Sequence, residues 1–128
     1  MKRKAREART KILFIGENAD IALLTALKRE GYETVACESP QEARASIYGF
    51  RPHLIMVHLS HSGRTDIALL QECRLMAEGI PIVGTTSIPG HETAMKALEE
   101  GATSFLFLPL ERAKIKKVVD DLLAEHEN

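Results

Sequence analysis

The chain has 128 residues, of which 45% are hydrophobic and 27% are charged, and its formal net charge is −1. This length and composition predict one folded domain with a sizeable core, and they exclude a disordered chain. No apolar run approaches the ~20 residues of a membrane span, and no apolar signal core follows the basic first residues, so we expect a cytoplasmic protein without a membrane partner.

Basic residues are concentrated at the start of the chain. Residues 1–11 contain six of the 17 lysines and arginines and one acidic residue, so the remainder is acidic, with 17 acids against 11 bases. We expect residues 1–10 to form a basic tail or linker. An acidic body with 5% aromatic residues and no tryptophan does not favour nucleic-acid binding.

Strand and helix signals alternate along the rest of the chain. Five short runs rich in apolar residues predict strands, and each is followed by apolar residues at helical spacing. The strands are predicted at residues 12–15, 33–37, 54–57, 80–85 and 105–108. The helices are predicted at about residues 19–30, 40–49, 66–78, 91–100 and 111–125.

The second helix has the clearest start signal. Ser39 as the N-cap, Pro40 at the first helical position and Glu42 at the third form a capping box. Apolar spacing alone predicts that Ile21 in the first helix and Leu98 in the fourth helix face the core.

The alternation of strands and helices predicts an α/β fold with a parallel sheet and helices on both of its faces. In such folds, ligands bind outside the carboxyl ends of the strands. The residues that follow each strand are therefore the candidate functional residues.

Several landmarks occur in a fixed order at characteristic spacing. They are Lys11-Ile12-Leu13-Phe14-Ile15, Gly31-Tyr32-Glu33, Arg51-Pro52-His53-Leu54-Ile55, Ile80-Pro81-Ile82-Val83, Gly101-Ala102 and Pro109. In these features, residues 11–125 resemble a response-regulator receiver domain, the signal-accepting module of bacterial two-component systems. The resemblance implies a flavodoxin-like, doubly wound sheet of five parallel strands in the order 2-1-3-4-5. Residues 126–128 would form a short C-terminal end.

The resemblance also implies a place for each part of a phosphorylation site. In the family, two acidic residues and an aspartate hold Mg²⁺, the aspartate accepts the phosphoryl group, and a hydroxyl and a lysine bind its oxygens. The acidic pair corresponds to Gly16 and Glu17, the phosphoacceptor to His58, the hydroxyl to Thr86 and the lysine to Leu108.

Three of these five parts are therefore replaced, including the nucleophile. A single carboxylate holds Mg²⁺ poorly because the ion keeps its waters unless several oxygen ligands replace them. We expect weak or absent Mg²⁺ binding, no cofactor and no catalytic residue. The sequence predicts a degenerate receiver, or pseudo-receiver, that is not an enzyme.

The residues of the family's conformational switch correspond to Thr86 and Phe105. Family members with an aromatic residue at the second position use the face made by the fourth helix, the fifth strand and the fifth helix for dimers and partners. We expect this chain to bind a signalling protein, or a second copy, through that face without phosphorylation. The alternative is that Phe105 is an ordinary core residue.

Two other functions stay open. His58, His61 and Glu17 could hold Zn²⁺, or the pocket of Glu17, His58, Thr86 and Leu108 could bind a small ligand. A phosphorelay protein with an atypical acceptor is the third possibility. The two cysteines, Cys37 and Cys73, have no metal-ligand spacing and are expected to be packing thiols.

Overall fold

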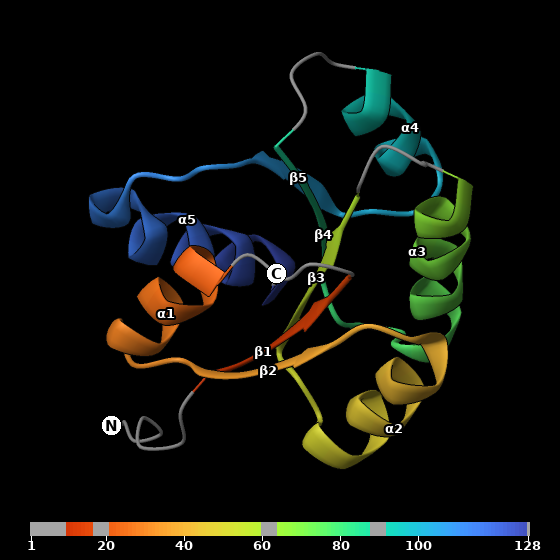
Figure 1. Ribbon diagram of the computed structural model, residues 1–128, viewed down its shortest axis with the longest axis horizontal. Helices are drawn as coiled ribbons and strands as arrows, with labels where there is room; N and C mark the ends of the chain where they lie inside the picture. Colours follow the sequence, from red (N-terminus) through yellow and green to blue (C-terminus); the bar gives the residue numbers. More distant parts are fainter. Residues whose placement is uncertain (1–9, 17–20, 60–63, 88–91, 128) are drawn as a thin grey trace.

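A computed structural model describes residues 10–16, 21–59, 64–87 and 92–127 of the chain. Its centre is a parallel sheet of five strands in the order β2-β1-β3-β4-β5 (Figure 1). The strands are β1 (Lys11–Ile15), β2 (Glu33–Cys37), β3 (Leu54–His58), β4 (Ile82–Thr86) and β5 (Ser104–Phe107). The helices are α1 (Ile21–Arg29), α2 (Pro40–Phe50), α3 (Arg64–Met76), α4 (Glu92–Glu99) and α5 (Arg112–Glu127).

Helices cover both faces of this sheet. Helices α1 and α5 lie on one face, and α2, α3 and α4 lie on the other (Figure 1). The predicted fold class and strand order are confirmed. Residues 1–9 of the predicted basic tail lie outside the described residues, as do Glu17, His61 and residue 128.

The core consists of two layers because successive side chains of a strand point to opposite faces. In β1, Ile12 and Phe14 pack against α1 and α5, whereas Leu13 and Ile15 pack on the side of α2 and α3. All four side chains are fully buried. A strand buried on both faces needs the continuous apolar run that the sequence shows.

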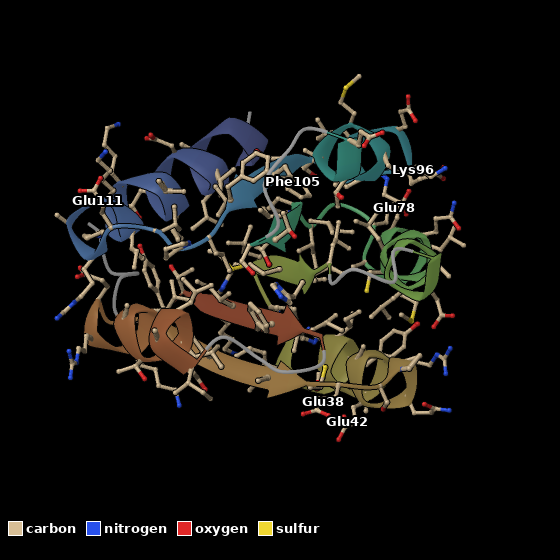
Figure 2. All side chains as sticks on the ribbon, turned by 45° about the horizontal axis from the view of Figure 1, so that its top comes forward. Glu38, Glu42, Glu78, Lys96, Phe105 and Glu111 are labelled. Atoms are coloured by element: carbon tan, nitrogen blue, oxygen red, sulfur yellow. The ribbon has the colours of Figure 1, made fainter. Side chains whose placement is uncertain are left out.

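The capping box of α2 is present as predicted. Its residue Glu42 is labelled in Figure 2, next to Glu38. The amide of Glu42 donates to the Ser39 hydroxyl over 3.1 Å, and the Glu42 carboxylate accepts from the amides of Glu38 and Ser39. These amide donors lower the pKa of Glu42 because they stabilise its ionised form.

Two side chains predicted to face the core are exposed. Ile21 is 70% exposed because the buried face of α1 is set by Leu23 and Ala26, and a residue two positions before Leu23 lies about 200° around the helix from it. Leu98 is 47% exposed because Ala94 and Ala97 form the buried face of α4.

Several strand boundaries also differ from the prediction by one or two residues. The ladder of β4 begins at Ile82, since the amide of Ile80 donates to Ala77 in the turn after α3 and Pro81 has no amide hydrogen. Strand β5 ends at Phe107, just before Leu108 and Pro109. Within the described part of the chain, no helix combines the length and the apolar character needed to cross a membrane.

The two cysteines are buried in the same apolar cluster between the sheet and helices α2 and α3. Burial raises the pKa of the Cys37 thiol to about 11 and that of the Cys73 thiol to about 12. Both residues are free cysteines, so the prediction that they are packing thiols is confirmed.

Candidate functional site

His58 ends β3 at the carboxyl edge of the sheet, where the resemblance places a phosphoacceptor. Its imidazole is half-buried and stacks on the Phe14 ring of β1, with the ring centroids 6.0 Å apart and the planes inclined by 27°. The side chain is therefore packed into the α1–α5 layer and does not stand free above the sheet.

The imidazole has a polar partner in Thr85. Nδ1 of His58 and Oγ1 of Thr85 share a hydrogen bond of 3.0 Å, and the two residues are paired in the β3–β4 ladder. Sequence reasoning singled out Thr86 and missed Thr85. Which of the two threonines faces His58 depends on the register of β3 against β4, and no local sequence motif indicates that register.

Thr86 is fully buried on the opposite face of β4. Its hydroxyl donates to the Leu59 carbonyl over 2.9 Å, and its own carbonyl accepts from the Leu108 amide over 2.7 Å. The hydroxyl thus connects β4 to the residue that follows β3.

Gly16 follows β1 and touches His58. Its φ of +153° is a conformation that side chains rarely adopt, and a Cβ atom built on Gly16 would lie 2.8 Å from the Cβ of His58. The structure therefore has no room for a carboxylate at this position. Glu17, the other member of the predicted acidic pair, lies outside the described residues.

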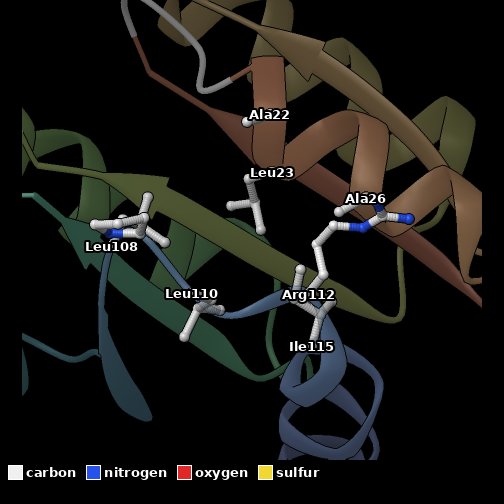
Figure 3. A pocket seen from close by; sticks show the side chains of 8 residues that line it. Ala22, Leu23, Ala26, Leu108, Leu110, Arg112 and Ile115 are labelled. Carbon is white, nitrogen blue, oxygen red and sulfur yellow. The ribbon is translucent and has the colours of Figure 1, made fainter.

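Leu108 is buried, with 6% of its surface exposed, and it belongs to the apolar cluster between the sheet and helices α1 and α5. It also lines an apolar cavity of about 110 Å³ between α1 and the segment that leads from β5 into α5 (Figure 3). Of the residues in the predicted ligand pocket, Leu108 lines this cavity, and His58 and Thr86 do not. Among the described residues of the predicted pocket, Leu108 is thus the one that also lines this cavity.

Phe105 lies on β5 at the edge of the sheet next to α4 (Figure 2). Its ring is partly buried against Gly84 of β4 and Ala97 of α4. Phe107 meets it edge to face, with the ring centroids 5.3 Å apart. Of the two predicted switch residues, Phe105 thus packs inward, and Thr86 lies on the same face of the sheet.

No group of three or more His, Cys, Asp or Glu side chains is placed to hold a metal ion within the residues that the structure describes. The predicted zinc ligands include His61 and Glu17, which lie outside those residues. His58, the third predicted ligand, shares a hydrogen bond with the Thr85 hydroxyl.

No protein-family model matches the chain. It is 29% identical over 103 residues to the transcriptional regulatory protein ZraR of Salmonella typhimurium, a match that covers 80% of the chain and 23% of ZraR. It is 28% identical over 102 residues to the phosphate regulon transcriptional regulatory protein PhoB of Pseudomonas aeruginosa, covering 77% of the chain and 44% of PhoB. The chain thus spans less than half the length of either relative.

Solved structures share the fold over most of the chain. A CheY-like response regulator receiver domain protein from Methanospirillum hungatei superposes with a TM-score of 0.78 at 20% identity, covering 94% of this chain and 98% of that one. The chain has a response-regulator receiver fold. NtrX from Brucella abortus matches with a TM-score of 0.81 at 26% identity, covering 94% of this receiver-fold chain and 28% of NtrX. The receiver fold and the sequence similarity to transcriptional regulators agree with the resemblance found in the sequence.

Proposed function

We propose that this receiver domain acts in signal transduction by binding a protein partner, and that it does so without phosphorylation of an aspartate. The observation that carries the proposal is the environment of His58, which occupies the phosphoacceptor position of the resemblance. Its imidazole stacks on Phe14 and shares a hydrogen bond with Thr85. No carboxylate is present at this position to form an aspartyl phosphate.

The surroundings of His58 support the same conclusion. Phosphoryl transfer requires cationic groups that offset the charge on the transferring group. The close approach of Gly16 to His58 leaves no room for one of the two acidic ligands of Mg²⁺, and Leu108 places apolar surface where the family has a lysine. A partner-binding role needs neither of these groups.

The face formed by α4 and β5 is the surface we propose for partner binding. Met95 is 61% exposed, Leu98 is 47% exposed and Phe107 is 40% exposed. Met95 and Leu98 lie three positions apart on α4, and Phe107 lies on β5, against which α4 packs. Exposed large apolar side chains that form a contiguous surface are typical of protein interaction sites. This arrangement agrees with the expectation that the α4–β5–α5 face binds a signalling protein or a second copy of the chain.

An amide NMR titration tests the absence of phosphorylation chemistry. Mg²⁺ is added alone and then together with beryllofluoride, which mimics an aspartyl phosphate, and an ordinary receiver domain is titrated in parallel. We expect the signals of Gly16, His58 and Thr86 to stay in place. Saturable shifts that extend to Phe105 would show a working phosphorylation switch and contradict the proposal.

Mass spectrometry after incubation with acetyl phosphate tests the atypical acceptor. We expect no added phosphoryl group on the intact chain. Incorporation that is lost in the His58→Gln variant would identify a phosphohistidine and favour the phosphorelay alternative instead.

The binding face is tested by sedimentation velocity over a range of concentrations and by partner capture. Leu98→Asp should abolish any self-association or capture. Leu75→Asp serves as the matched control because Leu75 is 83% exposed on α3, outside the proposed face. Equal effects of the two variants would show that the face is placed wrongly.

A further inference from the structure

Gly84 lies in the middle of β4, directly beneath the ring of Phe105. The two residues are paired in the β4–β5 ladder. A Cβ atom built on Gly84 would lie 2.7 Å from Cδ1 and 2.8 Å from Cε1 of Phe105, and 3.5 Å from the Cβ of Ala97. The first two distances are shorter than any ordinary carbon–carbon contact, so the ring occupies space that every other residue would fill.

A glycine inside a strand weakens the strand and often marks a close approach of another group. Here the approaching group is an aromatic ring. The φ of Gly84 is not in the positive range that favours glycine, so its lack of a side chain is explained by the ring and not by the backbone. Ala97, the small residue of α4 on the same side, would be in ordinary van der Waals contact with a Cβ atom at Gly84 and would not clash with it.

The ring of Phe105 in turn contacts the ring of Phe107. The two rings meet edge to face at 5.3 Å with an interplanar angle of 65°, an arrangement that aromatic pairs favour. Phe107 is 40% exposed and belongs to the proposed binding face. The partly buried ring of Phe105 therefore packs against the more exposed ring of Phe107.

We infer that Gly84 is a positioning residue that keeps Phe105 packed inward and thereby sets the shape of the α4–β5 face that a protein partner contacts. This inference rests on the proposed function, in which that face binds the partner. The inference names Gly84 as the residue that keeps this face in one shape, and this role requires no modification of His58.

A double-mutant cycle tests the inference with Gly84→Ala, Phe105→Ala and the double variant. Gly84→Ala alone should lower the urea midpoint of unfolding, because the added methyl group displaces the ring. In the Phe105→Ala background the same change should cause no loss, since the clash is gone and alanine restricts the unfolded chain more than glycine does. Equal losses in both backgrounds would overturn the inference.

NMR of the aromatic rings measures their relative positions, which a general loss of stability would not change. In the folded Gly84→Ala variant, the nuclear Overhauser contacts between Phe105 and Phe107 should weaken and the Phe107 ring signals should shift. Gly49→Ala is the matched control because nothing lies within 4 Å of a Cβ atom at Gly49. If Gly84→Ala does not fold, a folded double variant still supports the inference, and an unfolded one contradicts it.

The beryllofluoride titration keeps the two proposals distinguishable. Shifts at His58 that extend to Phe105 would contradict phosphorylation-independent action, whatever the cycle shows. A Gly84→Ala variant with an unchanged urea midpoint and unchanged Phe107 signals would contradict the role of Gly84 and leave the proposed function intact.

Discussion

The imidazole of His58 and the hydroxyl of Thr85 lie 3.0 Å apart, at the paired ends of β3 and β4. Phe14 stacks against the same imidazole. An aromatic ring and a buried hydroxyl together fix the orientation of a side chain that the receiver resemblance would assign to chemistry. The residue at this position is thus part of the packing of the sheet's carboxyl edge.

Valine substitutions at the two threonines of β4 should separate their roles. Thr86→Val leaves the buried Leu59 carbonyl without this donor and should lower the free energy of unfolding by about 2 kcal/mol. Thr85→Val should cost about 1 kcal/mol, because half-buried His58 can still bond to water. Urea denaturation of both variants measures the difference. A larger loss for Thr85→Val would show that the His58 contact carries more energy than its exposure indicates.

Gly16→Asp, which restores an acidic residue of the family pattern, should destabilise the chain and create no tight Mg²⁺ site. The new Cβ atom would collide with the Cβ of His58 at 2.8 Å, and the backbone conformation is itself unfavourable for aspartate. We expect a loss of more than about 2 kcal/mol in urea denaturation.

The control for this experiment is Gly49→Ala in α2. A Cβ atom at Gly49 meets nothing within 4 Å, and alanine favours a helix over glycine by up to about 1 kcal/mol. Gly49→Ala should therefore raise the stability while Gly16→Asp lowers it. Saturable Mg²⁺ binding by a stable Gly16→Asp variant would show that the carboxyl edge can still form a cation site.

Ser39→Ala should destabilise the start of α2 by about 1 kcal/mol, since the Glu42 amide loses the hydroxyl that accepts from it. Glu42→Gln should have a smaller effect, because an amide oxygen can still accept from the amides of Glu38 and Ser39. Hydrogen exchange at the amide of Glu42 measures the change locally. Unchanged protection in Ser39→Ala would show that the cap does not stabilise this turn.

The buried cysteines make stability depend on alkaline pH. The folded chain keeps its thiols protonated up to pKa values of about 11 for Cys37 and about 12 for Cys73, whereas unfolded thiols ionise near pH 9.0. Above pH 9.0 the unfolded state therefore binds fewer protons than the folded state, and the free energy of unfolding falls as pH rises toward 11 and 12. Urea denaturation between pH 8 and pH 11 should show the decline, and a Cys37→Ala/Cys73→Ala variant should show a shallower one.

The same burial predicts slow alkylation by iodoacetamide in the native chain. The thiolate is the reacting form, and both thiols are inaccessible and protonated at neutral pH. Rapid modification without denaturant would mean that the layer between the sheet and helices α2 and α3 opens frequently.

Local signals predicted most of the architecture. The continuous apolar runs, the capping box at Ser39 and the alternation of strands with helices depend on neighbouring residues, and the fold that they imply is the one found. Apolar spacing did not show which face of a short helix is buried. Ile21 and Leu98 were assigned to the core, although alanines and Leu23 form the buried faces of their helices.

The candidate site was harder to predict, because its contacts join residues far apart in the sequence. The bond between His58 and Thr85 depends on the register of β3 against β4. The sequence contains one sign of the packing of Phe105 on Gly84, which is the presence of a glycine inside an otherwise apolar strand. That signal indicates close approach but does not name the residue that approaches.

The two consecutive threonines of β4 place their side chains on opposite faces of the sheet at its carboxyl edge. Thr85 is joined to His58 in the layer of α1 and α5, while Thr86 faces the layer that contains Phe105. The imidazole and the aromatic pair lie in different layers, and between them lie the main chain of β4 and Leu59, whose carbonyl accepts from the Thr86 hydroxyl. Substitutions at His58 and at Phe105 should therefore affect stability independently, so that a double variant loses the sum of the two single losses.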